Sequence, residues 1–518
     1  MSAFAHIDPA VAALSALVGL IALLTLRGRR SSRLLPPGPK RWPIVGSAFS
    51  VPREREWLEY ERWSHEYDSD VLYYESWGRP FVVISSLQAA IDLLEKKSSL
   101  YADRCAPIVS QRLLRRDSCG WGWDLAFMPY SEPWKLARKL FTQHFRQSAS
   151  VAYREDEMRC GKELLRDIIR DPDNLFHHSR LTFGKLIMSV TYGIDVQSAD
   201  DVYITNAQKA LSALNATGNV GTYLVDFIPL LQYVPEWFPG AGWKRDARAW
   251  REATLRMAYK PFETVKAAMR DGSARPSVLT ALLEEYGERM TPDVEHAIVS
   301  SAGTAYEAAS ETIFSVILST ILAMILFPDV QVKAQAQIDR VVGHDRFPDF
   351  SDQPNMPYIA AICKEALRWR TGVPLSIAHR VMEDDTYKGY HIPRGSSVVA
   401  NSWAILRDQD RYPSPETFSP ERYLDAAGEL DPHAPEPTAA FGFGRRACAG
   451  SAMAQDALWA ATAQLLWAFD FRRAVDKQGR QVEIAGTYTS GFTRSPEPFA
   501  CAVQPRSEGI RELILAEA

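Results

Sequence analysis

The chain is poor in cysteine. Six of its 518 residues are cysteines, and no two of them form a C-x-x-C pair. This spacing argues against a zinc ribbon and against a thioredoxin-like redox site. So low a density is typical of a compartment where thiols stay reduced. Five of the six need no special role, because free cysteine is commonly a small core residue.

The chain also lacks a strong charge of either sign. Its formal net charge is −4, from 59 Lys and Arg against 63 Asp and Glu. Nothing in this balance points to nucleic acid as a partner. We find no internal repeat, no low-complexity stretch and no nicotinamide or flavin fingerprint. A redox reaction catalysed by this chain would therefore draw its electrons from another protein.

Charged side chains are missing altogether from one segment near the amino end. Residues 9–26 read PAVAALSALVGLIALLTL, which is long enough to span most of a bilayer as a helix. Four arginines follow within residues 27–33, whereas a cleaved signal peptide usually carries its basic residues before the apolar run. Because Lys and Arg gather on the cytoplasmic side, we expect residues 1–8 to be luminal, residues 9–26 to form a transmembrane anchor, and the remainder to be cytosolic.

A connector and one large body follow the predicted anchor. Residues 27–46 are basic and proline-rich, and prolines stiffen a linker of this kind. Residues 47–518 are expected to form a single body. The tripeptide Asn215-Ala216-Thr217 matches a glycosylation acceptor, and a cytosolic location would make that match accidental.

The body has a mostly helical pattern with short strands near each end. Residues 71–75 and 80–84 are β-rich and close together, which predicts a hairpin, and residues 387–400 again indicate short strands. Thr291 can cap a long helix that runs to Phe327, where Pro328 stops it. This helix of about 36 residues, on the order of 54 Å, must cross the whole body.

The sharpest local signal is the ten-residue stretch 441–450, FGFGRRACAG, which contains Cys448. Glycines allow tight turns and a close approach of the backbone to a ligand. The following stretch reads as a helix, and the positive end of a helix favours a thiolate over a thiol at Cys448. Arg446 can offer a bidentate fork to a carboxylate. The alternative, a glycine-rich turn around a buried free cysteine, would suit a lone Gly-x-Gly better than this combination.

The stretch resembles the haem-binding loop of the cytochrome P450 family. Glu365 and Arg368 match the E-x-x-R helix of that family, and Arg422, within PERY, matches its third charged member. Trp134 and Arg138 resemble its W-x-x-x-R helix. The resemblance implies a b-type haem with Cys448 as the thiolate ligand of the iron. It assigns the remaining cofactor contacts to Arg446, Trp134, Arg138, His379 and Phe441.

The long helix carries a second motif of the same family. Ala308-Ala309-Ser310-Glu311-Thr312-Ile313 resembles [AG]-G-x-[DE]-T-[TS], which implies that Glu311 and Thr312 deliver protons to bound oxygen. Ala309 replaces the glycine and Ile313 the last hydroxyl residue, which leaves the local bend of the helix open. Glu307 lies one turn before Glu311, and the sequence leaves open whether it faces the pocket.

The resemblance implies a mainly α fold with small β-sheets: one haem-binding body behind an amino-terminal transmembrane helix. It also implies a monooxygenase of the endoplasmic reticulum membrane that receives electrons from NADPH through a cytochrome P450 reductase. Residues 226–240 look most like fungal members that modify secondary metabolites, so a hydrophobic terpenoid, polyketide or alkaloid is the expected substrate. Two alternatives keep the haem: an isomerase or dehydratase that uses no dioxygen, and a sensor without turnover.

The same family pattern predicts two surfaces. The substrate pocket is expected to be mainly apolar. Its predicted lining segments are 107–125, Tyr306 to Thr312, Val373 to Ile377, and Thr489 to Phe492. The candidates for a basic face that docks the reductase are Arg138, Lys139, Arg445 and Arg446.

Overall fold

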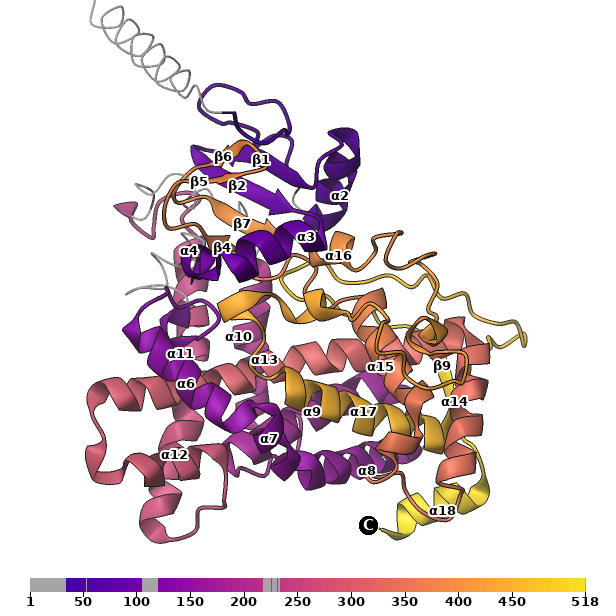
Figure 1. The fold of residues 1–518 in the computed structure, drawn as a ribbon. Helices are drawn as coiled ribbons and strands as arrows, with labels where there is room; N and C mark the ends of the chain where they lie inside the picture. The colour runs from indigo at the N-terminus through magenta and orange to yellow at the C-terminus, as the bar shows by residue number, and fades with distance from the viewer. Residues whose placement is uncertain are drawn as a thin grey trace, which may run out of the picture.

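The computed structural model describes residues 34–52, 54–104, 120–217, 225, 231 and 233–517. Four predicted segments lie outside the described residues: the luminal end 1–8, the anchor 9–26, residues 27–33 of the linker and residues 107–119 of the pocket. The described part is mostly helical with a few short strands (Figure 1). Its α-helices are α2 (Glu56–Glu66), α3 (Leu87–Ala90), α4 (Ser98–Tyr101), α6 (Glu132–Phe145), α7 (Gln147–Ser150), α8 (Arg154–Arg170), α9 (Leu175–Tyr192), α10 (Val202–Thr217), α11 (Trp243–Asp271), α12 (Val278–Tyr286), α13 (Pro292–Leu326), α14 (Pro328–Val341), α15 (Pro357–Trp369), α16 (Ser402–Ile405), α17 (Ser451–Ala468) and α18 (Glu508–Ala516).

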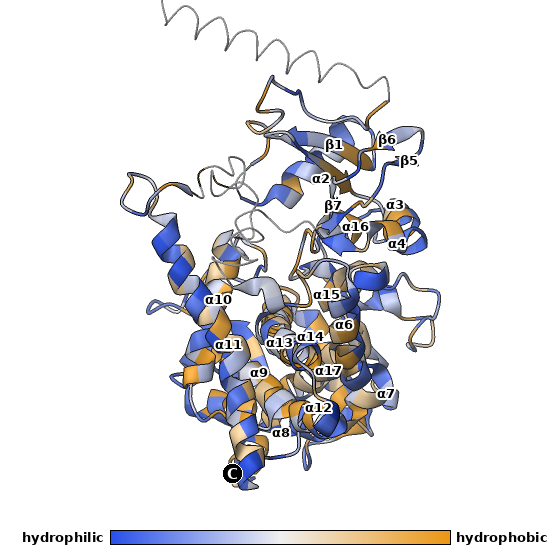
Figure 2. Cartoon of the chain, turned by 90° about the vertical axis from the view of Figure 1, so that its left-hand side faces the viewer, coloured by the Kyte–Doolittle hydropathy of each residue, from blue (hydrophilic) through white to orange (hydrophobic). Residues whose placement is uncertain are grey.

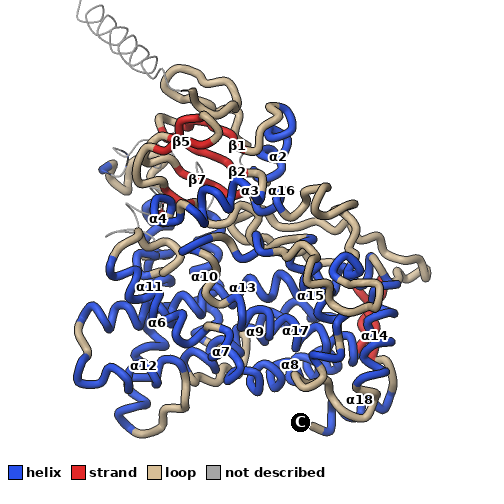
Figure 3. Tube along the Cα trace, in the orientation of Figure 1, coloured by secondary structure: helices blue, strands red, loops and turns tan. Residues whose placement is uncertain are grey.

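Most of the strands lie at one end of the body, beside the amino-terminal linker, whereas β8 and β9 form a separate pair near α14 (Figure 3). They are β1 (Val71–Ser76), β2 (Arg79–Ile84), β3 (Asp103–Arg104), β4 (His379–Arg380), β5 (Asp385–Tyr387), β6 (Tyr390–Ile392), β7 (Ser397–Ala400), β8 (Phe469–Arg473) and β9 (Cys501–Pro505). The main sheet has the order β1-β2-β7-β4-β3. Its β1–β2 hairpin confirms the prediction from the sequence. The pairing of β2 with β7 is parallel and joins segments more than three hundred residues apart, Phe81 facing Ser397.

Helix α13 crosses the helical part of the body. The Thr291 side chain accepts a hydrogen bond from the backbone N–H of Val294, Pro292 occupies the first turn, and Phe327 ends the helix. The predicted helix is thereby confirmed. Among the described residues, α13 is the helix long and apolar enough to cross a bilayer, yet most of that stretch is buried inside the protein. Its apolar character therefore reflects packing against α6, α9, α11 and α17.

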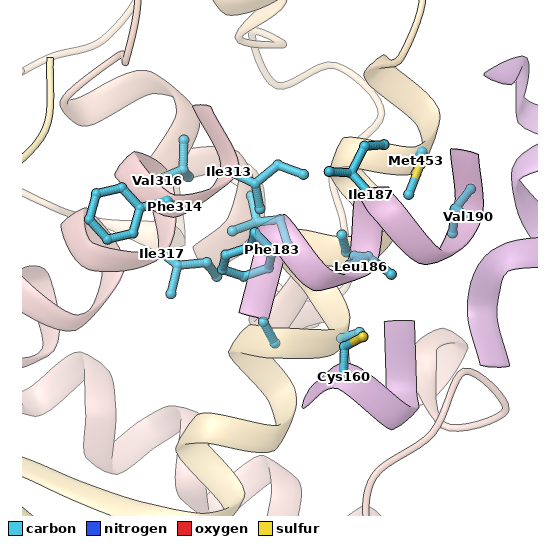
Figure 4. Close-up of a cluster of buried hydrophobic side chains, with 14 of the residues drawn as sticks. Cys160, Phe183, Leu186, Ile187, Val190, Ile313, Phe314, Val316, Ile317 and Met453 are labelled. Atoms are coloured by element: carbon cyan, nitrogen blue, oxygen red, sulfur yellow. The ribbon is translucent and has the colours of Figure 1, made fainter. Parts of the chain in front are cut away.

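The core is built where α13 meets its neighbours. Figure 4 shows Phe183 and Ile187 of α9 beside Ile313 and Ile317 of α13, with Met453 of α17 close by. Peripheral helices bury one face only. Helix α11 in Figure 2 alternates between hydrophilic and hydrophobic residues, as expected for a helix half in contact with solvent.

Candidate active site

The loop that carries Cys448 is held in place by its own backbone. The N–H of Cys448 donates to the carbonyl of Phe441 over 2.7 Å. Gly442 and Gly444 have positive φ angles of 73° and 56°. A side chain at Gly444 would bring its Cβ to 2.1 Å from the carbonyl oxygen of Leu94, so only glycine lets the loop pack here. Helix α17 begins at Ser451, as the sequence predicted.

Cys448 differs from the buried cysteines Cys160 and Cys363, because its side chain is open to an internal cavity. The protein around that cavity still desolvates the sulfur. Burial raises the pKa of the Cys448 thiol, while the backbone N–H of Gly450 and the charge of Arg138 lower it. The last two contributions are those that stabilise a thiolate.

The cavity has a volume of about 280 Å³ and mostly apolar walls. One wall is α13, through Thr304, Ala305, Ala308, Ala309, Thr312, Ile313 and Val316. The loop 440–450 supplies another, together with Met453, Ala454 and Leu458 of α17. Of the predicted lining segments, Leu125, several residues of α13, and Val373, Ser376 and Ile377 do line it. Tyr306 does not, since its hydroxyl donates to the carbonyl of Tyr203, and Phe492 instead contacts the ring of Phe127.

Cationic and polar side chains gather at one edge of the cavity. Arg104, Trp134, Arg138, His379 and Arg446 all line it. Arg446 donates to the carbonyls of Ala102, Leu125 and Met128 at 2.7, 3.2 and 2.8 Å. The indole N–H of Trp134 donates to the carbonyl of Leu125 as well, over 3.0 Å. Arg138 donates to the carbonyl of Ala447, and His379 Nδ1 lies 2.8 Å from the carbonyl of Tyr101.

The charges at this edge are poorly compensated. Burial, and then the charge of Arg104, lower the pKa of Arg446, and burial lowers that of Arg138. Burial and the charge of Arg104 also hold the pKa of His379 well below its usual range, so this imidazole is neutral. Carboxylates placed among these groups would relieve the repulsion. A thiol at the cavity, apolar walls and a cationic edge together fit a haem with its two propionates.

Arg104 belongs to this edge although its role was not predicted. It lies in β3 and contacts the carbonyl of Ala126 over 3.0 Å. The sequence around Arg104 carries no sign that the guanidinium reaches the cavity. The pairing of β3 with β4, which sets Arg104 opposite His379, brings it there.

The proposed oxygen-handling residues lie on different sides of α13. Thr312 lines the cavity, and its hydroxyl donates to the carbonyl of Ala308 over 2.8 Å. Glu311 instead pairs with Arg180 of α9, 3.3 Å away. Burial raises the pKa of Glu311, and the charge of Arg180 lowers it. Helix α13 is continuous through Ala309 and Ile313, the two departures from the family motif.

Two arginines share the carboxylate of Glu365. Its oxygens accept from Arg368 at 2.6 and 2.8 Å and from Arg422 at 3.2 Å. The backbone N–H of Ser419 adds a fourth bond of 2.9 Å. Glu365 and Arg368 are fully buried. This cluster ties α15 to the segment 417–422 that leads toward the Cys448 loop.

The fold and the cavity define a protein of the haem-thiolate class. The family model of cytochrome P450 matches residues 36–501, so the chain belongs to the cytochrome P450 family. Cytochrome P450 monooxygenase 98 of Postia placenta is 38% identical, over 94% of each chain. The tryptamine 4-monooxygenase of Psilocybe cyanescens is also 38% identical, over 95% of this chain and 97% of its own. Cytochrome P450 monooxygenase ple1 of Rhodocybe pseudopiperita is 35% identical over 98% and 96%.

Family membership settles the class of reaction. The chain is an oxidoreductase, a haem-thiolate monooxygenase whose electrons come from a partner reductase and whose substrate is a small molecule. When bound, a thiolate-ligated haem supplies the activation of dioxygen. The monooxygenase names of the relatives favour this reading over the isomerase and sensor alternatives.

Proposed function

We propose that this enzyme inserts one oxygen atom from dioxygen into a hydrophobic small molecule, as a hydroxylation step of secondary metabolism. The observation that carries the proposal is the apolar cavity lined by both the Cys448 thiol and the Thr312 hydroxyl. Apolar walls with few polar groups suit a hydrophobic ligand. One relative is named for tryptamine, an aromatic amine, which supports a small secondary metabolite as substrate.

The haem is held by Cys448 as its metal ligand and by five further side chains. Arg446, Trp134, Arg138 and His379 would hold the propionates, and Phe441 would lie against the group. All five line the cavity with Cys448. Cys448 is presented by a loop that Gly442 and Gly444 shape, so the sulfur position follows from the backbone.

Thr312 and Glu311 manage protons. The Thr312 hydroxyl is at the cavity, where it can hold a hydrogen bond to bound oxygen or water. Glu311 is one residue away and pairs with a half-exposed arginine, Arg180. This arrangement suits a carboxyl group that receives protons from solvent and passes them toward Thr312.

The electron donor is an NADPH-cytochrome P450 reductase that docks near Cys448. Of the four candidate cations, Arg138 and Arg446 line the cavity, whereas Lys139 and Arg445 are exposed. Lys139 and Arg445 therefore remain as docking charges, and exposed charges of this kind act mainly on the association rate. Charge reversal at both should lower the reduction rate several-fold at low salt and less at high salt.

The protein is a single-pass protein of the endoplasmic reticulum membrane with its body, residues 47–518, in the cytosol. The apolar run 9–26 followed by arginines supports this topology. Large apolar side chains just after it are exposed: Trp42 by 50%, Ile44 by 55% and Phe49 by 79%. Such residues beside an anchor suit contact with the bilayer interface. A protease-protection assay on microsomes tests the topology, since luminal protection of the body would contradict it.

The reaction is tested by expressing the enzyme with a reductase and supplying a panel of hydrophobic metabolites with isotopically labelled dioxygen. We expect NADPH-dependent incorporation of one labelled oxygen atom into the product. A product that forms without label would instead indicate the isomerase or dehydratase. A haem spectrum that no metabolite shifts and that gives no product would indicate the sensor.

A further inference from the structure

Two buried carboxyl groups lie side by side next to the cavity, and no site described above uses them. Asp124 is 0% exposed and Glu307 is 7% exposed. Asp124 Oδ1 accepts hydrogen bonds from the N–H of Ala126 over 2.8 Å and from the hydroxyl of Thr304 over 3.1 Å. Thr304 and Glu307 are three residues apart on α13 and therefore neighbours on its surface. Asp124, bonded to Thr304, thus sits close to Glu307.

The negative charges of Asp124 and Glu307 are compensated less completely than the charge of Glu365. The second oxygen of Asp124, Oδ2, is buried and has no hydrogen-bond partner in the described part of the chain. Two arginines lie near the pair: Arg180, which is paired with Glu311, and Arg104, whose charge acts on Asp124. Burial raises the pKa of Asp124 to about 6, although the charge of Arg104 lowers it. Burial, and then the negative charges of Asp124 and Glu311, raise the pKa of Glu307 well above its usual range. Such a pair stabilises any cation that reaches it.

An aromatic ring lies beside the same part of α13. Trp123 directly precedes Asp124, and its ring lies so close to α13 that a Cβ on Gly303 would be 2.7 Å from it. Gly303 is one turn before Glu307, so the ring and the carboxyl share one side of the helix. The ring centroid of Trp121 is 5.7 Å from that of Trp123, and Phe127 lies beyond Trp121. Ring faces attract cations, and tryptophan does so most strongly.

The acid pair lies directly behind the cavity wall. Leu125 and Ala126, the residues after Asp124, line the cavity, and so does Thr304. The N–H of Leu125 donates to the Thr304 hydroxyl over 2.9 Å, which fixes this wall to α13. A ligand in the cavity would touch Leu125, Ala126 and Thr304, and the two acids would lie directly behind these residues.

We propose that Glu307 and Asp124, with the ring of Trp123, form a subsite for a positively charged nitrogen of the substrate. This inference rests on the proposed function and narrows it: the substrate is a hydrophobic amine, protonated at its nitrogen. Neither acid lines the cavity, so both act on the ammonium group through their negative charge, from behind the wall that Leu125, Ala126 and Thr304 form. When the cation binds, the acid pair releases a proton to solvent, so the net charge of the site does not change.

The test compares two probes on the haem-loaded enzyme. One is the quaternary N,N,N-trimethyl derivative of tryptamine, which cannot coordinate iron. The other is its uncharged isostere, in which carbon replaces the nitrogen. The change in the haem absorption spectrum gives the Kd of each. We expect the wild-type enzyme to bind the cation about tenfold more tightly or better, the scale of one ion pair at a partly desolvated site.

Two variants and a matched control locate the preference. Glu307→Gln keeps the size of the side chain and should reduce the preference to less than about twofold, and Asp124→Asn should reduce it in part. Glu295→Gln changes an acid in the first turn of the same helix, which is paired with Lys266, and should keep the preference. A wild type that does not prefer the cation, or a preference that Glu307→Gln retains, overturns the subsite.

The outcome separates this inference from the proposed function. Each variant is first checked for the thiolate-haem band of its reduced carbon monoxide complex, at about 450 nm. If the wild type has the band and oxygenates a neutral hydrophobic substrate but shows no preference for the cation, only the amine subsite is wrong. If no labelled oxygen enters any substrate, the proposed function fails, whereas the probe measurements still decide the subsite.

Discussion

The buried carboxyl groups near the cavity fall into two kinds. Glu365 is fully buried and accepts four hydrogen bonds, three of them from two arginines. Asp124 is as deeply buried, yet one of its oxygens has no partner in the described residues, and its neighbour Glu307 is a second acid. A buried ion with all its hydrogen bonds made holds a fold together, whereas a buried acid with an unpartnered oxygen and a second acid beside it is set up for a proton or a ligand.

The same contrast holds for the two sides of the cavity as a whole. The Cys448 side is locked by glycine turns and by the Glu365 cluster. The α13 side carries groups with spare hydrogen-bonding capacity: Thr312, Asp124 and Glu307. We therefore expect changes on the Cys448 side to remove the haem or the fold, and changes on the α13 side to alter turnover, ligand preference and pH dependence.

The largest effect is expected from Cys448→Ala. Without the thiolate, the reduced carbon monoxide complex should lose its band at about 450 nm, and oxygenation should fall to background. Absorption spectra and product analysis check both. Cys363→Ala, at a buried cysteine away from the cavity, serves as the control and should keep the band. If Cys448→Ala keeps the band, Cys448 is not the haem ligand, and the contrast between the Cys448 side and the α13 side no longer holds.

Glu365→Gln should be the most destabilising of the acid substitutions. It leaves the buried Arg368 and the half-buried Arg422 without their carboxylate, and breaking a buried pair in this way costs about 3–5 kcal/mol. Chemical denaturation of the haem-loaded protein measures the loss. Glu307→Gln removes an acid with no cation beside it and should cost far less. Equal losses for the two substitutions would show that the two kinds of buried acid do not differ.

Thr312→Val should impair turnover while the haem stays bound. Valine keeps the shape of threonine but lacks the hydroxyl, and a positioned proton donor contributes about 100-fold or more. The measurement is labelled product formed per NADPH consumed, together with the carbon monoxide spectrum. Ser310→Ala on the same helix, where the hydroxyl bonds to the carbonyl of Tyr306, is the matched control. If Thr312→Val forms as much labelled product per NADPH consumed as the wild type, Thr312 is not part of the proposed proton path.

The smallest effect concerns how stability depends on pH. The folded-state pKa of Asp124 is raised from 3.8 to about 6, and that of Glu307 is raised well above its usual range. Because the protonated forms suit the fold, their stabilisation is complete below the unfolded-state pKa and is lost as the pH rises through the folded-state pKa. Wild-type Tm should therefore lose a contribution from Asp124 as the pH rises from 4 to about 6, and a second contribution as the pH rises through the raised pKa of Glu307.

Amide substitutions test that dependence. Asp124→Asn should flatten the Tm profile up to about pH 6, and Glu307→Gln should remove the loss of Tm that comes from the deprotonation of Glu307. Differential scanning calorimetry at constant ionic strength gives the profiles. Glu311→Gln should change the profile less, because Arg180 already offsets its charge. If the Tm profiles of the wild type and Glu307→Gln run parallel, the charge of Glu307 does not affect the stability of the folded protein, and this prediction is wrong.

The part of the site that could be predicted consists of short local motifs. The glycines around Cys448, the three-residue spacing of Glu365 and Arg368, and the capped helix after Thr291 all depend on neighbours in sequence. Backbone turns and helix faces follow from such spacing. The hairpin of β1 and β2 was predictable for the same reason.

The remainder depends on contacts between distant segments, which only the tertiary structure decides. Arg104 reaches the cavity because β3 pairs with β4, and Asp124 meets Thr304 across 180 positions of sequence. Glu311 and Thr312 are adjacent in the chain, yet a turn of about 100° per residue along α13 sends one toward Arg180 and the other to the cavity. The sequence by itself thus determined the class of chemistry, since a thiolate loop is local. The charge around the substrate pocket was decided by the packing of α13, because burial and distance to other charges exist only in the folded chain.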